Sequence, residues 1–351
     1  MKSYQFDEYG QPLKLFETET PAPQDEEVLV RINACGVCHS DIHLWEGYFD
    51  MGGGKKLDLA QGRPLPFSLG HEIVGEVVAV GDKAGGTKVG DKGVVYPWIG
   101  CGDCPVCAAG QEHVCNRPRA LGVNAQGGYS DHVLIPNGRY LYGYGDVPAS
   151  LACTYACSGL TAYSALMKTK SRATGRNLLI IGAGGVGMAG LALAQAVLDT
   201  EIIVADIDEA KLEAAKQAGA AHVINTKDAD AVKQVMKLTG GGAAAAIDFV
   251  GSGPSAGFGV GAIGKGGKLV IVGLFGGALP MSLPMFPLKA MAIEGSYVGS
   301  PQEMQELMAL VRDGKVKPIP VEARALEQAQ QTIDDLREGR IVGRVVLEPA
   351  F

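Results

Sequence analysis

The chain has 351 residues, of which 47% are hydrophobic and 20% are charged, and its mean hydropathy is +0.12. These values exclude a disordered chain and a collagen-like or coiled-coil fibre, and the length predicts roughly two domains of about 150 residues each. The 31 basic and 38 acidic residues give a net charge of −7 without a long basic run, so nucleic acid is not an expected partner.

The first part of the chain, from residue 1 to about residue 157, consists of short β-type runs interrupted by Gly and Pro. The clearest runs are EVLVRI (27–32) and EIVGEVVAVG (72–81). Because helical periodicity is almost absent, we expect an irregular, mainly β domain. The first residues, MKSYQFDEYGQPLKLFETETP, lack the continuous apolar stretch of a secretory signal peptide, which favours a cytoplasmic location.

From about residue 158, apolar runs alternate with Ala-rich helical stretches. This alternation predicts βαβ units, and therefore an α/β domain with a doubly wound parallel sheet and helices on both faces. We interpret the glycine-rich stretches at 52–54 and 257–267 as loops. The expected strands are 178–182, 202–206, 222–225, 245–251 and 268–273, and the expected helices are 186–198, 209–219 and 228–238.

The window 178–198 holds 21 uncharged residues, which is long enough to span a bilayer. Five glycines between residues 182 and 190 instead favour a turn between a strand and a helix, and three acidic residues follow by position 206. We therefore expect no membrane partner. The C-terminal part adds two helical stretches, 302–314 and 325–340, and a final strand at 341–349 that we expect to return to the first domain.

A glycine motif predicts a dinucleotide site. Gly182-Ala183-Gly184-Gly185-Val186-Gly187 fits G-x-G-x-x-G directly after a β run and before a helix, where backbone N–H groups can receive a pyrophosphate. Asp206 ends the next strand, where a carboxylate hydrogen-bonds the ribose and repels the 2′-phosphate of NADP, so NAD is favoured. Lys211 could reach a ribose hydroxyl or lie on the helix surface. The alternative is a sheet core whose glycines only permit tight connections.

The cysteines fall into a clustered set and a scattered set. Cys101, Cys104, Cys107 and Cys115 form C-x2-C-x2-C-x7-C, which suits one structural zinc without an open position better than an iron–sulfur cluster or disulfides. CGVCHSDIH (35–43), GHE (70–72) and ACTYACSG (152–159) hold the second set. Cys38, His71 and Cys157 could form a catalytic zinc site of three mixed ligands, but spacing alone does not join them.

These motifs together resemble the zinc-dependent alcohol dehydrogenases of the medium-chain dehydrogenase/reductase family over nearly the whole chain. The resemblance is carried by Cys38-His39-Ser40-Asp41, Gly70-His71-Glu72, the four-Cys segment, CSGLTAYSAL (157–166), GAGGVG with Asp206, and GRVVL (343–347). It implies a GroES-like catalytic domain at 1–157 and 297–351, a Rossmann NAD-binding domain at 158–296, and a homotetramer. It also implies Zn²⁺ twice per subunit, once catalytic and once structural, with NAD as cofactor.

The resemblance assigns Cys38, His71 and Cys157 to the catalytic zinc, with Glu72 beside the metal as a supporting or alternative ligand. Cys153 is the competing thiol, but Cys157 directly precedes Ser158-Gly159-Leu160-Thr161, as the family's ligand does. Asp41 would hold the His71 ring in the tautomer that binds zinc.

By the same resemblance, Ser40 would exchange the substrate hydroxyl proton, and His43 would pass it to solvent unless it is only a hydrogen-bonded structural histidine. The cofactor would contact His39, Val250, Val272 and Arg344 in addition to the glycine motif, Asp206 and Lys211. Trp45 and Trp98 are either substrate-pocket or core aromatics. Zinc would favour the alkoxide of the bound alcohol, and hydride would then pass to nicotinamide, giving an aldehyde or ketone.

Two alternatives stay open for the activity: a related carbonyl reductase or polyol or cyclic-alcohol dehydrogenase, and a non-enzymatic NAD-binding regulator. The regulator would be expected to lack a zinc ligand or Ser40, and the sequence keeps them all. Cys38 and His71 lie 33 positions apart, which is longer than in compact members of the family. We expect the enlarged loop at 50–66 to shape access to the pocket, so that shortening 51–62 changes the substrate range without removing zinc.

Overall fold

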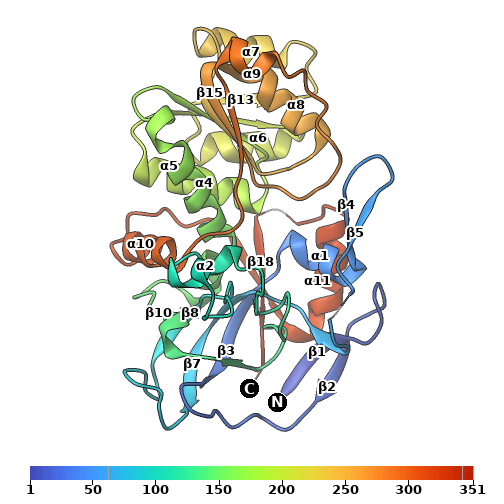
Figure 1. Cartoon of the computed structure of the whole chain (residues 1–351), viewed down its shortest axis with the longest axis vertical. Coiled ribbons are helices and arrows are strands. Elements are labelled where there is room, and N and C mark those ends of the chain that lie inside the picture. The colour runs from blue at the N-terminus through green and yellow to red at the C-terminus, as the bar shows by residue number, and fades with distance from the viewer. Residues whose placement is uncertain (62, 342, 351) are drawn as a thin grey trace. The chain divides into compact units, whose positions relative to one another are not determined.

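The computed structural model describes residues 1–61, 63–341 and 343–350 (Figure 1). Residue 62 of the predicted loop and residue 342 of the predicted final strand lie outside the described residues. The chain divides into two compact units. The first comprises Met1–Tyr48, Asp58–Leu160 and Val298–Phe351, and the second comprises Phe49–Leu57 and Thr161–Tyr297. The predicted domain limits remain a prediction.

The first unit is built on a seven-stranded sheet in the order β10-β8-β7-β3-β18-β17, with β9 also paired to β3. Its neighbours are antiparallel except β17 and β18. In Figure 1 the C-terminal strand β18 lies beside β3, and Val346 pairs with Gly36. The strands are β3 (Val28–Gly36), β7 (Glu72–Val80), β8 (Lys92–Val95), β9 (His132–Ile135), β10 (Leu141–Tyr142), β17 (Val321–Ala325) and β18 (Arg344–Glu348).

A smaller antiparallel sheet, β2-β1-β6, completes the strands of this unit, and short helices carry its functional motifs. The strands are β1 (Lys2–Phe6), β2 (Lys14–Glu17) and β6 (Phe67–Ser68). The α-helices are α1 (His39–Glu46), α2 (Pro105–Ala108), α3 (Ala149–Ala152), α10 (Pro301–Arg312) and α11 (Ala329–Arg337). The 3-10 turns are η1 (Glu112–Val114), η2 (Gly138–Tyr140), η3 (Cys153–Ala156) and η4 (Leu326–Gln328).

The second unit holds a six-stranded parallel sheet in the order β13-β12-β11-β14-β15-β16. When these strands are numbered along the chain, their order across the sheet is 3-2-1-4-5-6. This is the order of a doubly wound dinucleotide-binding fold, in which ligands bind beyond the carboxyl ends of the strands. The strands are β11 (Asn177–Ile181), β12 (Glu201–Asp206), β13 (His222–Asn225), β14 (Ala243–Asp248), β15 (Ile263–Ile271) and β16 (Ala292–Gly295).

Helices connect these strands and pack on them. The helix α4 (Ser158–Ala173) precedes the sheet, and the others are α5 (Gly185–Val197), α6 (Glu209–Gln217), α7 (Ala231–Leu238), α8 (Gly253–Ala262) and α9 (Met285–Lys289). The central strands are nearly continuous apolar runs because both faces are covered, and Leu179, Ile203, Ala246 and Leu269 belong to one buried core.

The window 178–198 forms the end of β11, a turn and α5. Among the described residues, no helix combines the length and the apolar character that a bilayer crossing requires.

The predicted loop at 257–267 is wrong, because this stretch contains the end of α8 and the start of β15. Ser252 and Ser255 cap the helix reciprocally, and a proline stands in its first turn. A side chain at position 259 would be crowded, because a Cβ there would lie 2.9 Å from Leu269 Cδ1. Gly259 therefore allows α8 to pack closely on the sheet, whereas the sequence pattern suggested a loop.

Candidate metal centres and cofactor site

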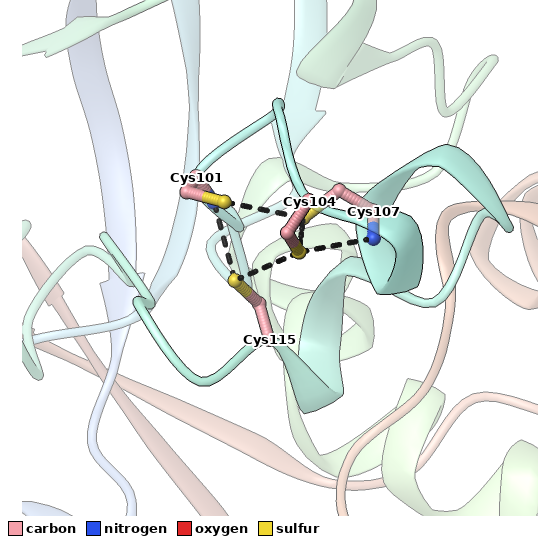
Figure 2. A group of neighbouring side chains, drawn as sticks. All are labelled: Cys101, Cys104, Cys107 and Cys115. Atoms are coloured by element: carbon pink, nitrogen blue, oxygen red, sulfur yellow. Dashed lines mark hydrogen bonds between the residues drawn. The ribbon is translucent and has the colours of Figure 1, made fainter.

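The four clustered cysteines converge within one short segment (Figure 2). Cys104 Sγ lies 3.5 Å from Cys107 Sγ and 3.8 Å from Cys115 Sγ, and Cys101 Sγ lies 3.9 Å from Cys107 Sγ. A tetrahedron of thiolates about 2.3 Å from one zinc has edges of about 3.8 Å. The sulfurs therefore already have the spacing of a tetrahedral zinc site, and all four are free thiols.

Backbone N–H groups point at the sulfurs of this cluster. Cys101 N–H and Arg117 N–H donate to Cys115 Sγ, at 3.4 and 3.3 Å, and Cys107 N–H donates to Cys104 Sγ at 3.5 Å. The two N–H groups lower the pKa of Cys115 to about 6. By contrast, a hydrogen bond to Asp103 raises the pKa of Cys101 to about 12. The cluster thus favours thiolate at some positions before metal binds.

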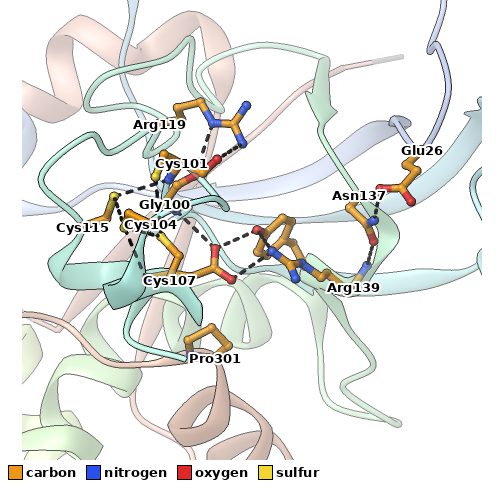
Figure 3. Close-up of polar contacts among 12 residues, drawn as sticks. Glu26, Gly100, Cys101, Cys104, Cys107, Cys115, Arg119, Asn137, Arg139 and Pro301 are labelled. Atoms are coloured by element: carbon orange, nitrogen blue, oxygen red, sulfur yellow. Dashed lines mark hydrogen bonds and ion pairs between the residues drawn. The ribbon is translucent and has the colours of Figure 1, made fainter. Parts of the chain in front are cut away.

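A buried carboxylate attaches this cysteine segment to η2, which directly precedes β10 of the main sheet. Glu112, on η1, accepts hydrogen bonds from Gly100 N–H (3.3 Å), Arg139 (3.0 Å) and Tyr140 (2.7 Å). Figure 3 follows this network from the cysteines to Arg139, whose N–H donates to Asn137 Oδ1 at 2.8 Å. The segment is therefore held at both ends, as expected for a structural site.

The second centre brings together three residues that are far apart in the sequence. Cys38 precedes α1, His71 precedes β7, and Cys157 follows η3. Their ligand atoms all lie within 4.8 Å of one another, and all three residues are buried. The hydrogen bond with Cys157 lowers the pKa of Cys38 well below its usual range, and His71 and Arg344 add to the shift. Two sulfurs and one nitrogen fit a zinc site with a fourth position open.

Asp41 determines how the His71 ring is oriented. As the third residue of α1, it accepts the Cys38 N–H at Oδ2 (2.9 Å), which caps the helix. Its Oδ1 lies 3.1 Å from His71 Nδ1, so the other ring nitrogen, Nε2, faces the two cysteines. The Tyr129 hydroxyl donates to Asp41 Oδ2 at 3.0 Å.

Ser40 and Trp98 lie against the metal-binding residues of this centre. Ser40 Oγ lies 3.2 Å from Cys38 Sγ and 3.3 Å from His71 Nε2, and the Trp98 ring lies 5.3 Å from the His71 ring between centroids. His43 is partly buried on the same helix as Ser40, and burial together with His39 lowers its pKa. Burial therefore favours the neutral form of His43, which is the form able to accept a proton.

Glu72 and Arg344 form a buried ion pair next to the centre. Glu72 Oε1 also accepts the N–H of Ser158, which directly follows the ligand Cys157, at 2.9 Å. Burial raises the pKa of Glu72, and Arg344 opposes that shift. Both carboxylate oxygens therefore have protein partners, which makes Glu72 a supporting residue in this structure.

The glycine motif has the shape of a phosphate cradle. Gly182 has φ +94°, a left-handed conformation that favours glycine, and a Cβ at Gly187 would lie 1.8 Å from Gly182 O. A Cβ at Gly184 would meet nothing within 4 Å, and Gly184 starts α5 without a side-chain cap. Open space and free N–H groups at this helix N-terminus suit a pyrophosphate.

Asp206 ends β12 beside this cradle. Its carboxylate accepts hydrogen bonds from Ala183 N–H (2.7 Å), Ile207 N–H (2.7 Å) and Asp208 N–H (3.0 Å). A carboxylate has about four acceptor positions, so one remains for a ribose hydroxyl. A pocket of about 350 Å³ lies next to Asp206 in the chain, and Ile207, Lys211 and Asn225 are among the residues that line it.

Two family domains match the chain. Residues 24–143 match the alcohol dehydrogenase GroES-like domain, and residues 185–313 match the zinc-binding dehydrogenase domain. The chain belongs to the zinc-binding alcohol dehydrogenase family. Family membership confirms the predicted fold class, a GroES-like domain combined with a Rossmann-like cofactor domain.

Several relatives match this dehydrogenase over its full length. The NAD-dependent alcohol dehydrogenase of Sulfurisphaera tokodaii is 40% identical over 351 residues, which is 99% of this chain and 100% of the relative. The enzyme of the same name from Saccharolobus solfataricus is 38% identical over the same coverage. The crystal structure of the Aeropyrum pernix alcohol dehydrogenase has a TM-score of 0.89 at 32% identity and covers 99% of this chain and 100% of that one.

Within this dehydrogenase, the structure selects Cys157 over Cys153 as the third metal-site cysteine, because Cys153 Sγ donates to Ser150 O instead. The role of Arg344 toward a phosphate and that of exposed His39 near a pyrophosphate remain predictions. Trp45 is buried, its indole N–H donates to Gln11 O at 2.7 Å, and its part in a substrate pocket also remains a prediction.

Sequence reasoning missed two residues of these centres. Tyr129 lies in GGYSDHVLIP, 88 positions after Asp41, and Glu112 lies among exposed residues of the cysteine loop. Neither position has a local pattern that distinguishes it. The Cys38-x-x-Asp41 spacing of a helix cap was the one available signal, and it pointed to Asp41 alone.

Proposed function

We propose that this protein is an NAD-dependent zinc alcohol dehydrogenase that oxidises primary or secondary alcohols to aldehydes or ketones. The main support is the buried group of Cys38, His71 and Cys157, which offers three protein ligands for a metal. Ser40 Oγ lies 3.3 Å from His71 Nε2 in the same group. Four-ligand sites such as the cysteine cluster are structural, whereas sites of three protein ligands leave a position for substrate.

The residues around the centre have separable tasks. Zinc, when bound, supplies a Lewis acid that lowers the pKa of a bound hydroxyl group. Ser40 is placed to accept the hydroxyl proton. His43 lies three residues later on the same helix, and burial lowers its pKa, so it would be the next group to receive the proton. Trp98 covers one side of His71, which limits water there. Asp41 keeps His71 in the metal-binding tautomer.

The cofactor is held by the second unit. Gly182, Gly184 and Gly187 shape the cradle for the pyrophosphate, and Asp206 receives a ribose hydroxyl. When bound there, NAD would supply the hydride acceptor of the reaction, and the residues of this chain would hold and orient it. A carboxylate at Asp206 opposes the 2′-phosphate of NADP. The names of the relatives with 40% and 38% identity support the choice of NAD.

Carbonyl reduction is the reverse of the same step and needs no other residues, so the physiological direction depends on substrate supply. The homotetramer and the cytoplasmic location expected from the sequence are proposals that need separate tests. A polyol or cyclic-alcohol dehydrogenase is the second candidate, because it would use the same metal ligands and the same Ser40.

The test measures reduction of NAD and of NADP by a panel of primary, secondary, cyclic and polyhydric alcohols, with metal content determined on the same sample. We expect two zinc ions per chain, activity with NAD well above that with NADP, and loss of activity after chelation. Cofactor binding without turnover of any alcohol, in protein that holds both zinc ions, would favour the regulator and overturn this proposal.

A further inference from the structure

We propose that Tyr129 is a positioning residue of the catalytic metal centre, acting through Asp41 on His71. The inference rests on the proposed function only in requiring that Cys38, His71 and Cys157 hold zinc. Tyr129 is fully buried, and its hydroxyl donates to Asp41 Oδ2 at 3.0 Å.

The two oxygens of the Asp41 carboxylate have different partners, and this explains how Tyr129 would act on His71. Oδ2 accepts two hydrogen bonds, from Cys38 N–H and from Tyr129, whereas Oδ1 lies 3.1 Å from His71 Nδ1. Two donors on one oxygen fix the plane of the carboxylate. Without the hydroxyl, the carboxylate is held by the single N–H of Cys38 and can rotate about its side-chain bonds.

Tyr129 packs closely against the segment that carries His71. A Cβ at Gly70, which directly precedes His71, would lie 2.5 Å from Tyr129 Cδ1 and 2.7 Å from Cys35 Sγ. The Tyr129 N–H also donates to Leu69 O at 2.9 Å. The ring therefore packs against the segment that carries His71, and its hydroxyl reaches the carboxylate that orients His71. Residues that orient metal ligands in this way typically contribute about 10- to 100-fold to metal affinity.

The matched control is Tyr96, which is equally buried and donates its hydroxyl to Gly299 O at 2.8 Å. We compare Tyr129→Phe with Tyr96→Phe by chelator competition for the catalytic zinc and by the absorption spectrum of the cobalt-substituted protein. Tyr129→Phe is expected to weaken zinc binding about tenfold and to shift the cobalt spectrum, whereas Tyr96→Phe changes neither. Melting temperatures of both variants measure the general cost of a lost buried hydroxyl.

A double-mutant cycle tests the route through Asp41. In an Asp41→Asn background, Tyr129→Phe is expected to have little additional effect on zinc affinity, because the group it positions is already changed. Equal zinc affinities for the two Phe variants, or full additivity with Asp41→Asn, would overturn the inference. If the wild type holds only one zinc ion per chain, the proposed function fails instead.

A separate observation concerns the hairpin inside the enlarged loop. The strands β4 (Tyr48–Asp50) and β5 (Lys56–Asp58) pair, and Phe49–Leu57 belongs to the compact unit that contains the parallel sheet. Gly277 N–H donates to Asp50 O at 3.4 Å. A Cβ at Gly52 would lie 2.7 Å from Gly277 C, so backbone meets backbone.

The segment that the hairpin touches follows β15 at the carboxyl end of the parallel sheet. Val272 N–H donates to Asp248 O at 2.9 Å, and Gly276 forms a bridge with Ser252 beyond β14. Dinucleotides bind at this end of such sheets. We infer that the hairpin positions residues 272–277 for the cofactor, and therefore that it acts on cofactor affinity rather than on substrate range.

The three glycines of the hairpin turn provide the test. Gly52 and Gly54 have φ of +78° and +76°, but a Cβ at Gly54 would meet nothing within 4 Å. Gly52→Ala and Gly54→Ala therefore carry the same backbone strain, and only the first disturbs the contact. We expect the NADH dissociation constant to rise about fivefold in Gly52→Ala, because binding would then have to order one or two loop residues. In Gly54→Ala the constant should stay near the wild-type value.

The readouts separate this inference from the proposed function. Zinc content and the KM for alcohol are expected to be unchanged in both variants. Equal NADH affinities in the two variants, or a change confined to the alcohol KM, would overturn the role of the hairpin. Absence of NADH binding by the wild type would overturn the proposed cofactor site itself.

Discussion

The two metal centres of this protein are built in opposite ways. The four-cysteine centre lies within residues 101–115, and its ligands are brought together by the turns of one short segment. The second centre takes its ligands from positions 38, 71 and 157, so it forms only when β3, β7 and η3 have packed together.

Their surroundings differ as well. In the four-cysteine centre, backbone N–H groups approach the sulfurs, and two of the four cysteines are partly exposed. In the second centre every ligand is buried, and side chains that include Asp41 and Glu72 surround it. The formation of the local metal centre therefore depends on its own loop. The formation of the dispersed centre depends on the whole fold and on the side chains that contact its ligands.

The largest expected effect is the loss of catalysis when the dispersed centre loses a ligand. Cys38→Ala should lower zinc content from two ions to one per chain and reduce alcohol oxidation to background, with the fold retained, because two remaining ligands hold zinc poorly. Metal analysis and NADH production measure both effects. Cys153→Ala, also fully buried but outside the ligand set, is the control and should keep both zinc ions. An active Cys38→Ala enzyme would remove the catalytic assignment.

The second effect falls on stability. Cys104→Ser should also lower the zinc content to one ion, but its main result should be a melting temperature lower by roughly 10 °C, because loss of a metal ranks among the most destabilising changes. Activity per folded molecule should stay close to wild type. A variant that melts normally but turns over no alcohol would show that the two centres are not functionally distinct.

The same contrast explains what the sequence could predict. The spacing of Cys101, Cys104, Cys107 and Cys115 predicted their centre directly, because the chain between them is too short to separate them. For Cys38, His71 and Cys157, the residues supplied candidates, and the resemblance to a family was needed to join them. Tyr129 could not be predicted, because its contact with Asp41 depends on how β3, β7 and the 120–130 segment pack.

The fold shows a similar limit. Four of the six strands of the parallel sheet and the helices α5, α6 and α7 were predicted to within three residues, because period and turn residues agree there. The strand β15 begins five residues before its predicted start, and β16 was not among the predicted strands. The helix α8 was missed, since its glycines at 257, 259 and 261 argue against a helix locally. The sheet beneath the helix explains one of them, because Leu269 and Ile181 approach Gly259 closely.

A third prediction concerns the carboxylate behind the dispersed centre. Asp41→Asn keeps the shape of the side chain but removes the charge that fixes the His71 tautomer, so zinc affinity at that centre should fall about 10- to 100-fold. Chelator competition measures the change, and the four-cysteine site in the same molecule serves as the reference. If the dispersed centre kept its wild-type zinc affinity, the His71 ring would be oriented by packing alone, for example against Trp98.

The smallest effect is expected from the carboxylate at the local centre. Asp103 hydrogen-bonds Cys101 and pairs with Arg117, but both charged side chains are about two-thirds exposed. Asp103 raises the pKa of Cys101 to about 12, so Asp103→Asn should lower that pKa and favour the thiolate that zinc requires. Zinc affinity should therefore change by less than about threefold, and toward tighter binding, because exposed ion pairs contribute little. Chelator competition at several pH values tests the sign. If Asp103→Asn weakened zinc binding as much as Asp41→Asn, the two centres would depend equally on a supporting carboxylate, and the distinction between a local and a dispersed site would rest on sequence spacing alone.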